Sequence, residues 1–330
     1  MNARQQVEDW REAGGYIPHT PVSSSHLTLL PDDASADPTL SELDALYTAA
    51  DSLSVEAALL HRRTLALLAW AGTILTLAFL LYDEASLLWM IMVVGAMLLA
   101  EGYLERRAVS SDNHGRYVEY RALAECLRVQ AYLRYAGTSI SVSSLLSFTQ
   151  KDEMPWVANV MEELSSKATP PIAAHDIRFS WLEGQRSYHE QAGRKSALQL
   201  ARSEQIVRSA TAASIILYLF ALGFELACGG WLLPPIIQTA HLSAWRAGLK
   251  IALGSMSAAS LFVSGYYDNL SVPRVYADHQ RLERFYSQME DRIAKEGQTD
   301  ALLVEIAREE LMENANWCSY QQDDAPNLTL

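Results

Sequence analysis

Histidine, cysteine and carboxylate side chains are the groups that most often catalyse reactions or bind metals, and in this chain the histidines and cysteines are scattered. The eight histidines and three cysteines do not occur at the spacings of a metal site or a disulfide framework. The sequence has no glycine-rich phosphate loop, no HExxH helix and no GxSxG turn. His189, beside Glu190, and His279, beside Asp278, are expected to be solvated residues on helix surfaces, and Cys126 a small packing residue. The sequence therefore predicts a non-enzymatic protein without metal or cofactor.

One group of charged residues has a spacing with a structural meaning. Arg121, Glu125 and Arg128 are separated by four and three residues, so a helix brings the Glu125 carboxylate within reach of both guanidinium groups. We expect this charge network to join helices of a bundle. Aromatic and amide side chains are expected to add contacts to it: Tyr120, Trp181, Gln185 and Tyr188. Two interpretations stay open, because these residues can hold the helices of one chain together or form contacts between copies.

The elements that position these residues follow from four apolar stretches in an otherwise acidic chain: residues 64–82, 86–104, 209–226 and 249–267. A helix of about 20 apolar residues crosses the roughly 30 Å of hydrocarbon in a bilayer. The first two stretches are separated only by Asp83, Glu84 and Ala85. The sequence therefore predicts an all-α polytopic membrane protein with two transmembrane helical hairpins, which make four spans, and a cytoplasmic helical bundle.

Residues near the ends of these spans are predicted to anchor them at the membrane surface. Glu101 and Glu225 lie close to span ends, and Trp231 lies in the loop after the third span. Anchoring is favoured because no charge lies in the middle of a span, where ion or proton transport would need one. An ion-handling role for Glu225 and a re-entrant turn around Trp231 are the alternatives.

The fourth span is rich in small residues, notably Gly254, Ser257, Ala258, Ser260 and Ser264. Gly254 and Ala258 have the small-xxx-small spacing that lets two helix backbones approach closely. Two hypotheses explain this face. It packs within one chain, or it meets copies of itself around a pore lined by serine.

Basic residues that flank the spans set the predicted orientation. Arg62 and Arg63 precede the first span and Arg106 and Arg107 follow the second, whereas the loop between these spans has no basic residue. The second loop carries two basic residues, which weakens the contrast without reversing it. Both termini are therefore predicted to be cytoplasmic. The net charge of −13 argues against a nucleic-acid partner, and the three dispersed cysteines indicate a reducing, cytosol-facing location.

The charged segments divide the chain into two halves of similar order. Each half runs from a helix into two spans and then into a charged helix, which suggests a duplication. Ser41 and Asp44 form the expected cap of a helix that runs into the first span. The predicted organisation is a flexible acidic N-terminal tail over 1–40, a first two-span unit over 41–137 with a cytoplasmic helix at 116–136, a connection over 138–175, a second two-span unit over 176–297 with a cytoplasmic helix at 274–295, and a C-terminal helix and tail over 298–330.

Three segments of the predicted cytoplasmic helices, taken in order along the chain, resemble one family. They are Tyr120-Arg121-Ala122-Leu123-Ala124-Glu125 with Leu127-Arg128-Val129-Gln130 and Gly137, then Trp181-Leu182-Glu183-Gly184-Gln185 with Tyr188-His189, and then Glu313-Asn314-Ala315-Asn316-Trp317. The family is the SLOG-associated two-transmembrane effector (SLATT-like) superfamily of bacterial conflict systems. The resemblance covers roughly residues 45–318.

The resemblance implies an effector region that oligomerises in the bacterial inner membrane and disrupts it when a partner or a nucleotide signal is sensed. Relatives often carry a nucleotide-sensing domain before the spans, whereas about 60 mostly polar residues stand there in this chain. A homo-oligomer and a sensor protein acting in trans are therefore the expected partners, beside the lipid bilayer. A membrane scaffold that recruits partners and a constitutive channel are the alternative functions.

Overall fold

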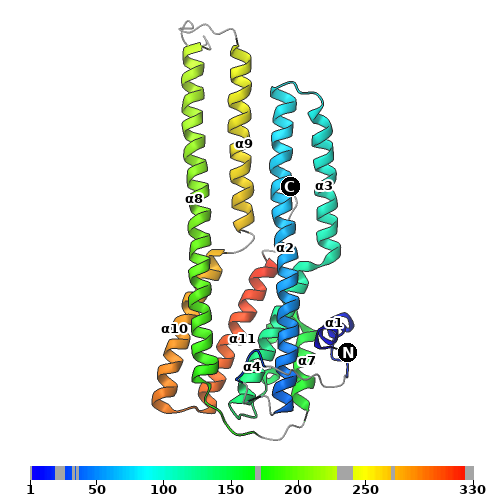
Figure 1. The fold of residues 1–330 in the computed structure, drawn as a ribbon, viewed down its shortest axis with the longest axis vertical. Helices are drawn as coiled ribbons and strands as arrows, with labels where there is room; N and C mark the ends of the chain where they lie inside the picture. The colour runs from blue at the N-terminus through cyan, green and yellow to red at the C-terminus, as the bar shows by residue number, and fades with distance from the viewer. Residues whose placement is uncertain are drawn as a thin grey trace. The chain divides into compact units, whose positions relative to one another are not determined.

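The computed structural model (Figure 1) describes residues 2–18, 27–31, 34, 37–167, 172–228, 241–268 and 272–323. Every regular element in these residues is a helix and none is a strand, which confirms the predicted all-α class. The chain divides into two units, each described by itself below. The bundle unit comprises Met1–Leu60, Asp112–Lys195 and Arg274–Asn327, and the span unit comprises His61–Ser111, Ser196–Pro273 and Leu328–Leu330.

Helix α1 (Ala3–Ala13) packs on the bundle unit through one apolar side. Val7 and Trp10 are completely buried, and Arg11 pairs with Glu119 of the bundle at 2.5 Å. The structure therefore differs here from the flexible tail predicted over 1–40. The physical reason is that two apolar residues three positions apart share one helical face, and this signal is weak within a mostly polar segment.

Helix α2 (Pro38–Glu84) begins in the bundle unit and continues without a break through the first predicted span, as expected. Its N-terminus is capped by Asp37, whose Oδ1 accepts hydrogen bonds from the amides of Thr39 at 2.8 Å and Leu40 at 2.9 Å. The cap predicted at Ser41 lies inside the helix. The shift follows from the proline at the first helical position, whose fixed φ favours a helix start there.

Helix α4 (Asn113–Tyr135) runs through the core of the bundle unit and agrees with the helix predicted over 116–136. Gly137 follows its end with a φ of 77°, a left-handed conformation that terminates helices and that a side chain would strain. Three short helices lie in the predicted connection: α5 (Val142–Leu145), α6 (Phe148–Glu153) and α7 (Pro155–Ser166).

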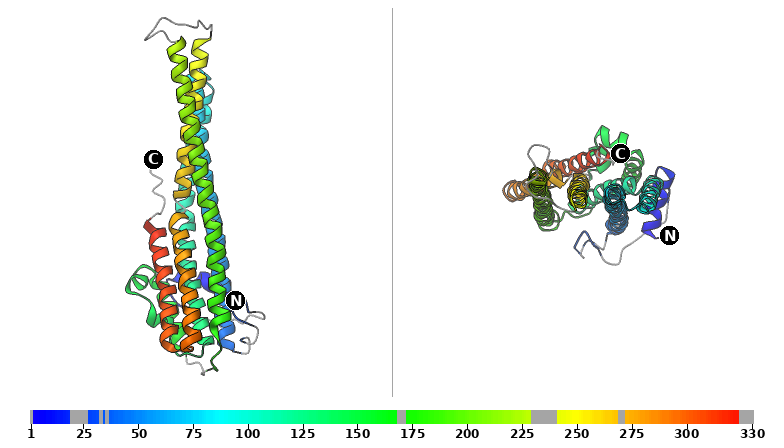
Figure 2. Two further views of the ribbon diagram at one scale, coloured as in Figure 1. Left: turned by 90° about the vertical axis from the view of Figure 1, so that its left-hand side faces the viewer. Right: turned by 90° about the horizontal axis from the view of Figure 1, so that it is seen from above.

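The second half of the bundle unit begins with the π-helix η2 (Arg178–Leu182), which leads directly into α8 (Glu183–Cys228). Helices α10 (Val272–Glu296) and α11 (Asp300–Asp323) complete it, near the predicted helices at 274–295 and within 298–330. In Figures 1 and 2, α11 lies beside both α4 and α10. The core of this unit combines side chains from distant segments: Trp10, Leu123, Leu127, Trp181, Tyr286 and Ile306.

Three of the described helices are long and apolar enough to cross a membrane: α2, Arg178–Cys228, and Leu242–Tyr266 within α9 (Leu242–Asp268). Helix α3 (Met90–Ser111), which holds most of the second predicted span, does not meet these limits. Ser86 adopts a left-handed φ of 55°, and the helix starts only at Met90. The apolar run of α3 therefore extends only from Met90 to Ala100, which is about three turns of helix. Large apolar side chains are exposed along this unit, including Trp70, Met92, Leu99, Leu219 and Leu261.

Close packing joins α2 to α9 within the span unit. A Cβ atom at Gly72 would lie 2.4 Å from the ring of Phe262, and a Cβ atom at Gly254 would lie 2.8 Å from the side chain of Leu80. Glycine at both positions therefore lets the two helices approach, and a larger residue would force the facing side chain to move. This geometry favours the first hypothesis for the small-residue face, packing within one chain, at Gly254.

The docking of α1 gives the first testable prediction. Trp10→Ala should raise amide hydrogen exchange in α1 by at least 100-fold in the detergent-solubilised chain, because removing a buried tryptophan costs about 3–5 kcal/mol. Arg4→Gln, which removes an exposed ion pair with Glu56, is the control and should change exchange little. If α1 of the unaltered chain already exchanges at the rate of unstructured peptide, the sequence-based prediction of a tail is right and the docked helix is wrong.

Candidate functional site: a buried charge network

The predicted charge network of α4 is present, and it extends to a helix that the sequence did not connect to it. The Arg128 guanidinium pairs with Glu125 on its own helix and with Glu310 of α11, at 2.6 Å in the second pair. Glu125 also pairs with Arg121 at 2.6 Å, and Arg121 reaches Asp51 of α2 at 3.1 Å. The network therefore connects α2, α4 and α11 through charged hydrogen bonds.

This network is buried where it crosses to α11. Glu125, Arg128 and Glu310 are 4%, 8% and 3% exposed, whereas Asp51 and Arg121 lie nearer to solvent. Burial raises the pKa of Glu310, and the Arg128 guanidinium opposes that rise. Buried charges of this kind are tolerated only when each one is paired, so the network fixes the register of α4 against α11.

Trp181 brings the π-helix η2 into the same network. Its indole Nε1 donates to Glu310 at 3.0 Å, and its ring stacks on Tyr132 with ring centroids 5.0 Å apart and planes inclined by 7°. The Tyr132 hydroxyl donates toward the carbonyl oxygens of Ser180 at 3.0 Å and Leu29 at 3.1 Å. Trp181 thus satisfies the second oxygen of Glu310, and its ring is held by α4.

A pair of histidines lies next to the network, and it corrects the expectation that both are solvated. His189 of α8 is 5% exposed, and its Nδ1 lies 2.9 Å from Nδ1 of His279 in α10, which is half-buried. One ring must donate and the other accept, so a neutral pair makes this bond. Burial, the neighbouring His279 and two arginines, Arg128 and Arg121, lower the pKa of His189 to about 3. In the sequence each histidine stands beside an acidic residue, Glu190 or Asp278. This local pattern does not indicate that the two histidines pair with each other across helices.

The other predicted bundle residues have separate environments. Tyr120 is buried against α1, with the Arg11 guanidinium 5.8 Å above its ring. Gln185 is buried, and its Oε1 accepts no hydrogen bond from the described residues. Tyr188 is 46% exposed and meets His189 edge to face at 5.1 Å. Of the seven predicted contact residues, the structure therefore joins four in one network: Arg121, Glu125, Arg128 and Trp181.

Glu310 is the functional candidate that sequence reasoning missed, although a signal was present. On α11 the buried positions Leu303, Ile306, Ala307 and Asn314 recur at helical spacing, and Glu310 falls on this same stripe. An acidic residue in an otherwise inward-facing stripe requires a buried cation, and Arg128 is the cation that the fold supplies.

Among the predicted residues of the span unit, Glu225 has a charged partner in the structure, and the others that the structure describes differ in their exposure. Glu225 accepts two hydrogen bonds from Arg246, each at 2.6 Å, so its structural role is an ion pair near the end of α8. Glu101 is half-buried on α3, and Trp231 lies outside the described residues. On α9, Ser257 is exposed, while three residues are half-buried: Ala258, Ser260 and Ser264.

A second ion pair involves one of the two basic residues of the second loop region, which weakened the charge contrast used to predict the orientation. Lys250 of α9 donates to both carboxylate oxygens of Glu84 at the end of α2, at 2.8 and 3.1 Å. Both basic residues of the second loop region are therefore neutralised within the span unit, since Arg246 pairs with Glu225.

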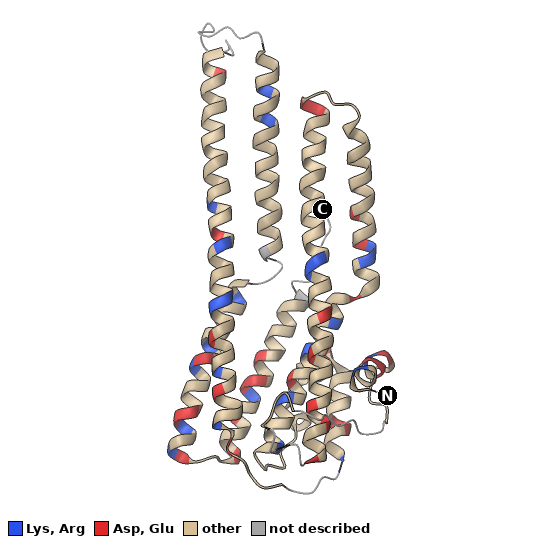
Figure 3. Cartoon of the chain, in the orientation of Figure 1, with Lys and Arg blue, Asp and Glu red and all other residues tan. Residues whose placement is uncertain are grey.

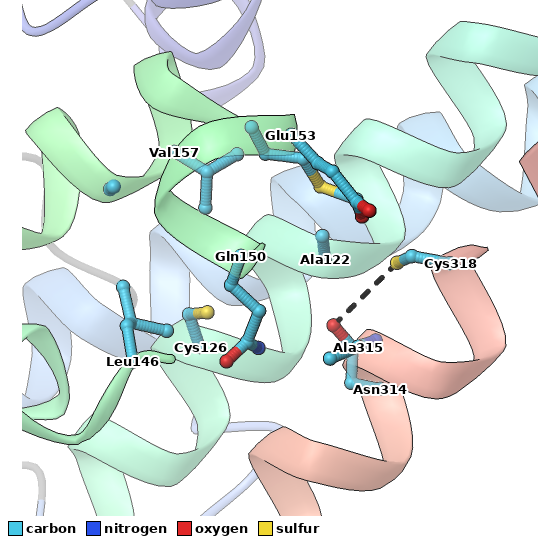
Figure 4. Close-up of a pocket in the computed structure, with 11 residues that line it drawn as sticks. Ala122, Cys126, Leu146, Gln150, Glu153, Val157, Asn314, Ala315 and Cys318 are labelled. Carbon is cyan, nitrogen blue, oxygen red and sulfur yellow. Dashed lines mark hydrogen bonds between the residues drawn. The ribbon is translucent and has the colours of Figure 1, made fainter. Parts of the chain in front are cut away.

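A small pocket in the bundle unit lies between α4, α6, α7 and α11 (Figure 4). Cys126 and Cys318 both line it as free thiols, and Cys318 Sγ donates to Asn314 Oδ1 at 3.9 Å. Burial raises the pKa of both thiols, so neither is a thiolate at neutral pH. Cys126 is thus a buried packing residue, as predicted.

Two of the three sequence segments that carry the family resemblance contribute side chains that meet at Glu310, just before the third segment. The first supplies Arg128, the second supplies Trp181, and Glu310 lies one turn before the third. Comparison of the chain with protein-family models, curated proteins and solved structures finds no match. The family assignment therefore stays a prediction, and the candidate site rests on its geometry.

The buried network predicts a large coupling between α4 and α11. Arg128→Met should destabilise these helices by about 3–5 kcal/mol, because it leaves the buried Glu310 carboxylate without a cation, whereas Glu310→Gln should cost less, because Arg128 keeps its pair with Glu125. The measurement is amide hydrogen exchange of α4 and α11 in detergent, made on both single variants and on the double variant. The exposed pair Arg292–Glu305 is the control and should contribute less than about 1 kcal/mol. Additive losses in the double variant would mean that Arg128 and Glu310 do not interact.

Glu313, half-buried on α11, predicts a pH dependence. Burial, and then the nearby Glu125 carboxylate, raise the pKa of Glu313 from 4.5 to about 8. Between these values the folded chain keeps a proton that the unfolded chain releases, so this residue lowers stability as the pH rises. Glu313→Gln should therefore gain stability relative to the unaltered chain from pH 5 to pH 8, with the difference constant above about pH 9. Thermal unfolding across this range tests it, and parallel curves for the two proteins would contradict it.

Proposed function

We propose that this chain is a non-enzymatic effector of the bacterial inner membrane, which oligomerises and permeabilises the membrane when a partner or a nucleotide signal acts on its bundle unit. In this proposal the four apolar stretches form two transmembrane hairpins, and the shorter α3 inserts together with α2. Both termini lie in the cytoplasm. A sensor protein acting in trans supplies the signal, as the family resemblance implies.

The observation that carries this proposal is the continuity of α2 and α8. Each helix contributes polar residues to the bundle unit and then continues, without a break, as an apolar helix long enough to cross a membrane. Asp51 of α2 belongs to the charge network, and His189 of α8 belongs to the histidine pair beside it. A ligand that rearranges these contacts acts on helices that themselves form the spans.

The absence of catalytic chemistry in the proposal is supported by how the reactive groups of the bundle are used. The carboxylates and arginines of the network pair with one another, and the histidine pair is closed by its own hydrogen bond. The thiols of Cys126 and Cys318 are buried. In the described residues these groups hold helices together instead of lining an open cleft.

A scaffold that recruits partners and conducts nothing is the second candidate. One observation favours it, because the bundle unit exposes two phenylalanines, Phe148 at 82% and Phe179 at 73%. Exposed aromatic side chains of this size are frequent at protein interfaces. The two candidates differ in one measurable property, which is ion flow through the membrane.

The proposal predicts depolarisation of bacteria that express the chain together with its neighbouring genes, measured with a potential-sensitive dye. Gly254→Leu should abolish it, because the new side chain would collide with Leu80 and separate α9 from α2. Gly95→Leu on α3 is the matched control and should have no effect, since nothing lies within 4 Å of that position.

The membrane-inserted amount of each variant is measured in the same cells. Unchanged depolarisation by the inserted Gly254→Leu protein would contradict a pore that depends on this helix contact. A well-inserted unaltered chain that never depolarises the cells, with or without its neighbours, would reject the effector and favour the scaffold.

A further inference from the structure

The two ends of the span unit differ in how their basic residues are neutralised. At the end where the hairpins turn, Arg246 and Lys250 are each paired with a carboxylate. At the opposite end, Arg208 of α8 pairs with Glu204, but the exposed arginines of the α2–α3 hairpin have no ion-pair partner among the described residues. These arginines, which we call the arginine belt, are Arg62, Arg63, Arg106 and Arg107.

Within the part of the chain that the structure describes, most arginines of the bundle unit are paired, unlike those of the belt. In the bundle unit most arginines hold a carboxylate: Arg4, Arg11, Arg121, Arg128, Arg134, Arg178, Arg186, Arg194, Arg281 and Arg292. A shortage of acids does not explain the belt, because the chain has 39 acidic and 26 basic residues. The belt therefore marks a place where the protein itself does not supply the counter-charge.

The belt lies where the apolar part of the helices ends. From Arg63 to the end of α2 the helix rises about 32 Å, and from the start of α3 to Arg106 about 24 Å, at 1.5 Å per residue. The length on α2 matches the roughly 30 Å of a bilayer's hydrocarbon, and the length on α3 is several ångströms shorter. Figure 3 shows basic segments on both α2 and α3 near the end of the hairpin that is opposite its turn, with almost uncharged helix between. The belt is thus at the level expected for lipid headgroups.

We propose that the arginine belt binds the phosphate groups of anionic phospholipids. A guanidinium group binds phosphate through two parallel hydrogen bonds, and arginine is weakly hydrated enough to do so at an interface. A headgroup such as phosphatidylglycerol brings a net negative charge, whereas phosphatidylcholine neutralises its own phosphate with an ammonium group. The belt therefore selects lipids by net charge. This inference rests on the membrane insertion proposed above.

The test uses the full-length chain purified in detergent and mixed with phosphatidylglycerol or phosphatidylcholine, with bound lipid quantified by native mass spectrometry. The unaltered chain should bind phosphatidylglycerol in preference. The double variants R62Q/R63Q and R106Q/R107Q should each lose this preference by about fivefold per arginine, the equivalent of about 1 kcal/mol. Because binding is measured in detergent, the result does not depend on whether the chain depolarises cells.

The control is R284Q/R308Q, which removes two exposed arginines of the bundle unit for which the described residues supply no carboxylate partner. It should keep the full preference for phosphatidylglycerol. Equal loss in this control would show that only overall charge matters, and it would overturn the proposal. The same conclusion would follow if the unaltered chain bound both lipids equally, or if both belt variants kept their preference.

Discussion

The bundle unit depends on one buried cation. Arg128 is held between Glu125 of its own helix and Glu310 of α11, and Trp181 binds the remaining oxygen of Glu310. A guanidinium group cannot be left unpaired in this position, and neither carboxylate can be left there alone. Apolar side chains alone would allow α11 to slide along α4 by a turn. The charges oppose such a shift because it would take the buried Glu310 carboxylate away from Arg128 and Trp181, so the network specifies one arrangement of helices and not only their association.

The second constraint comes from helices whose two parts lie in different surroundings, the packed core of the bundle unit and the exposed apolar surface of the span unit. The first part of α2 buries Leu46 and Leu53 in the bundle core, whereas its later part exposes Trp70 and Phe79. The change occurs within one uninterrupted helix. Helical hydrogen bonding makes this possible because it satisfies the backbone internally, whatever surrounds the side chains. The chain therefore passes from the bundle core to the exposed apolar segment without an intervening loop.

Local features of this fold could be predicted from the sequence, and long-range ones could not. The contact of Glu125 with Arg121 and Arg128 follows from helical spacing, and the end of α4 at Gly137 follows from glycine's tolerance of positive φ. Glu310 is 182 positions from Arg128, and His189 is 90 positions from His279, so their pairing depends on the tertiary fold. The docking of α1 was missed because Trp10 and Val7 are a small apolar signal. The late start of α3 was missed because a left-handed residue at Ser86 has no sequence mark.

The ion pair between Lys250 and Glu84 has a consequence for biogenesis. Glu84 is synthesised long before Lys250, and in a chain that inserts as proposed it already lies at the far surface of the membrane when α9 leaves the ribosome. The translocating lysine then meets a fixed carboxylate on arrival, which lowers the cost of moving its charge across. The first hairpin thus acts as a template for the second, and the order of the two halves along the chain has a physical reason.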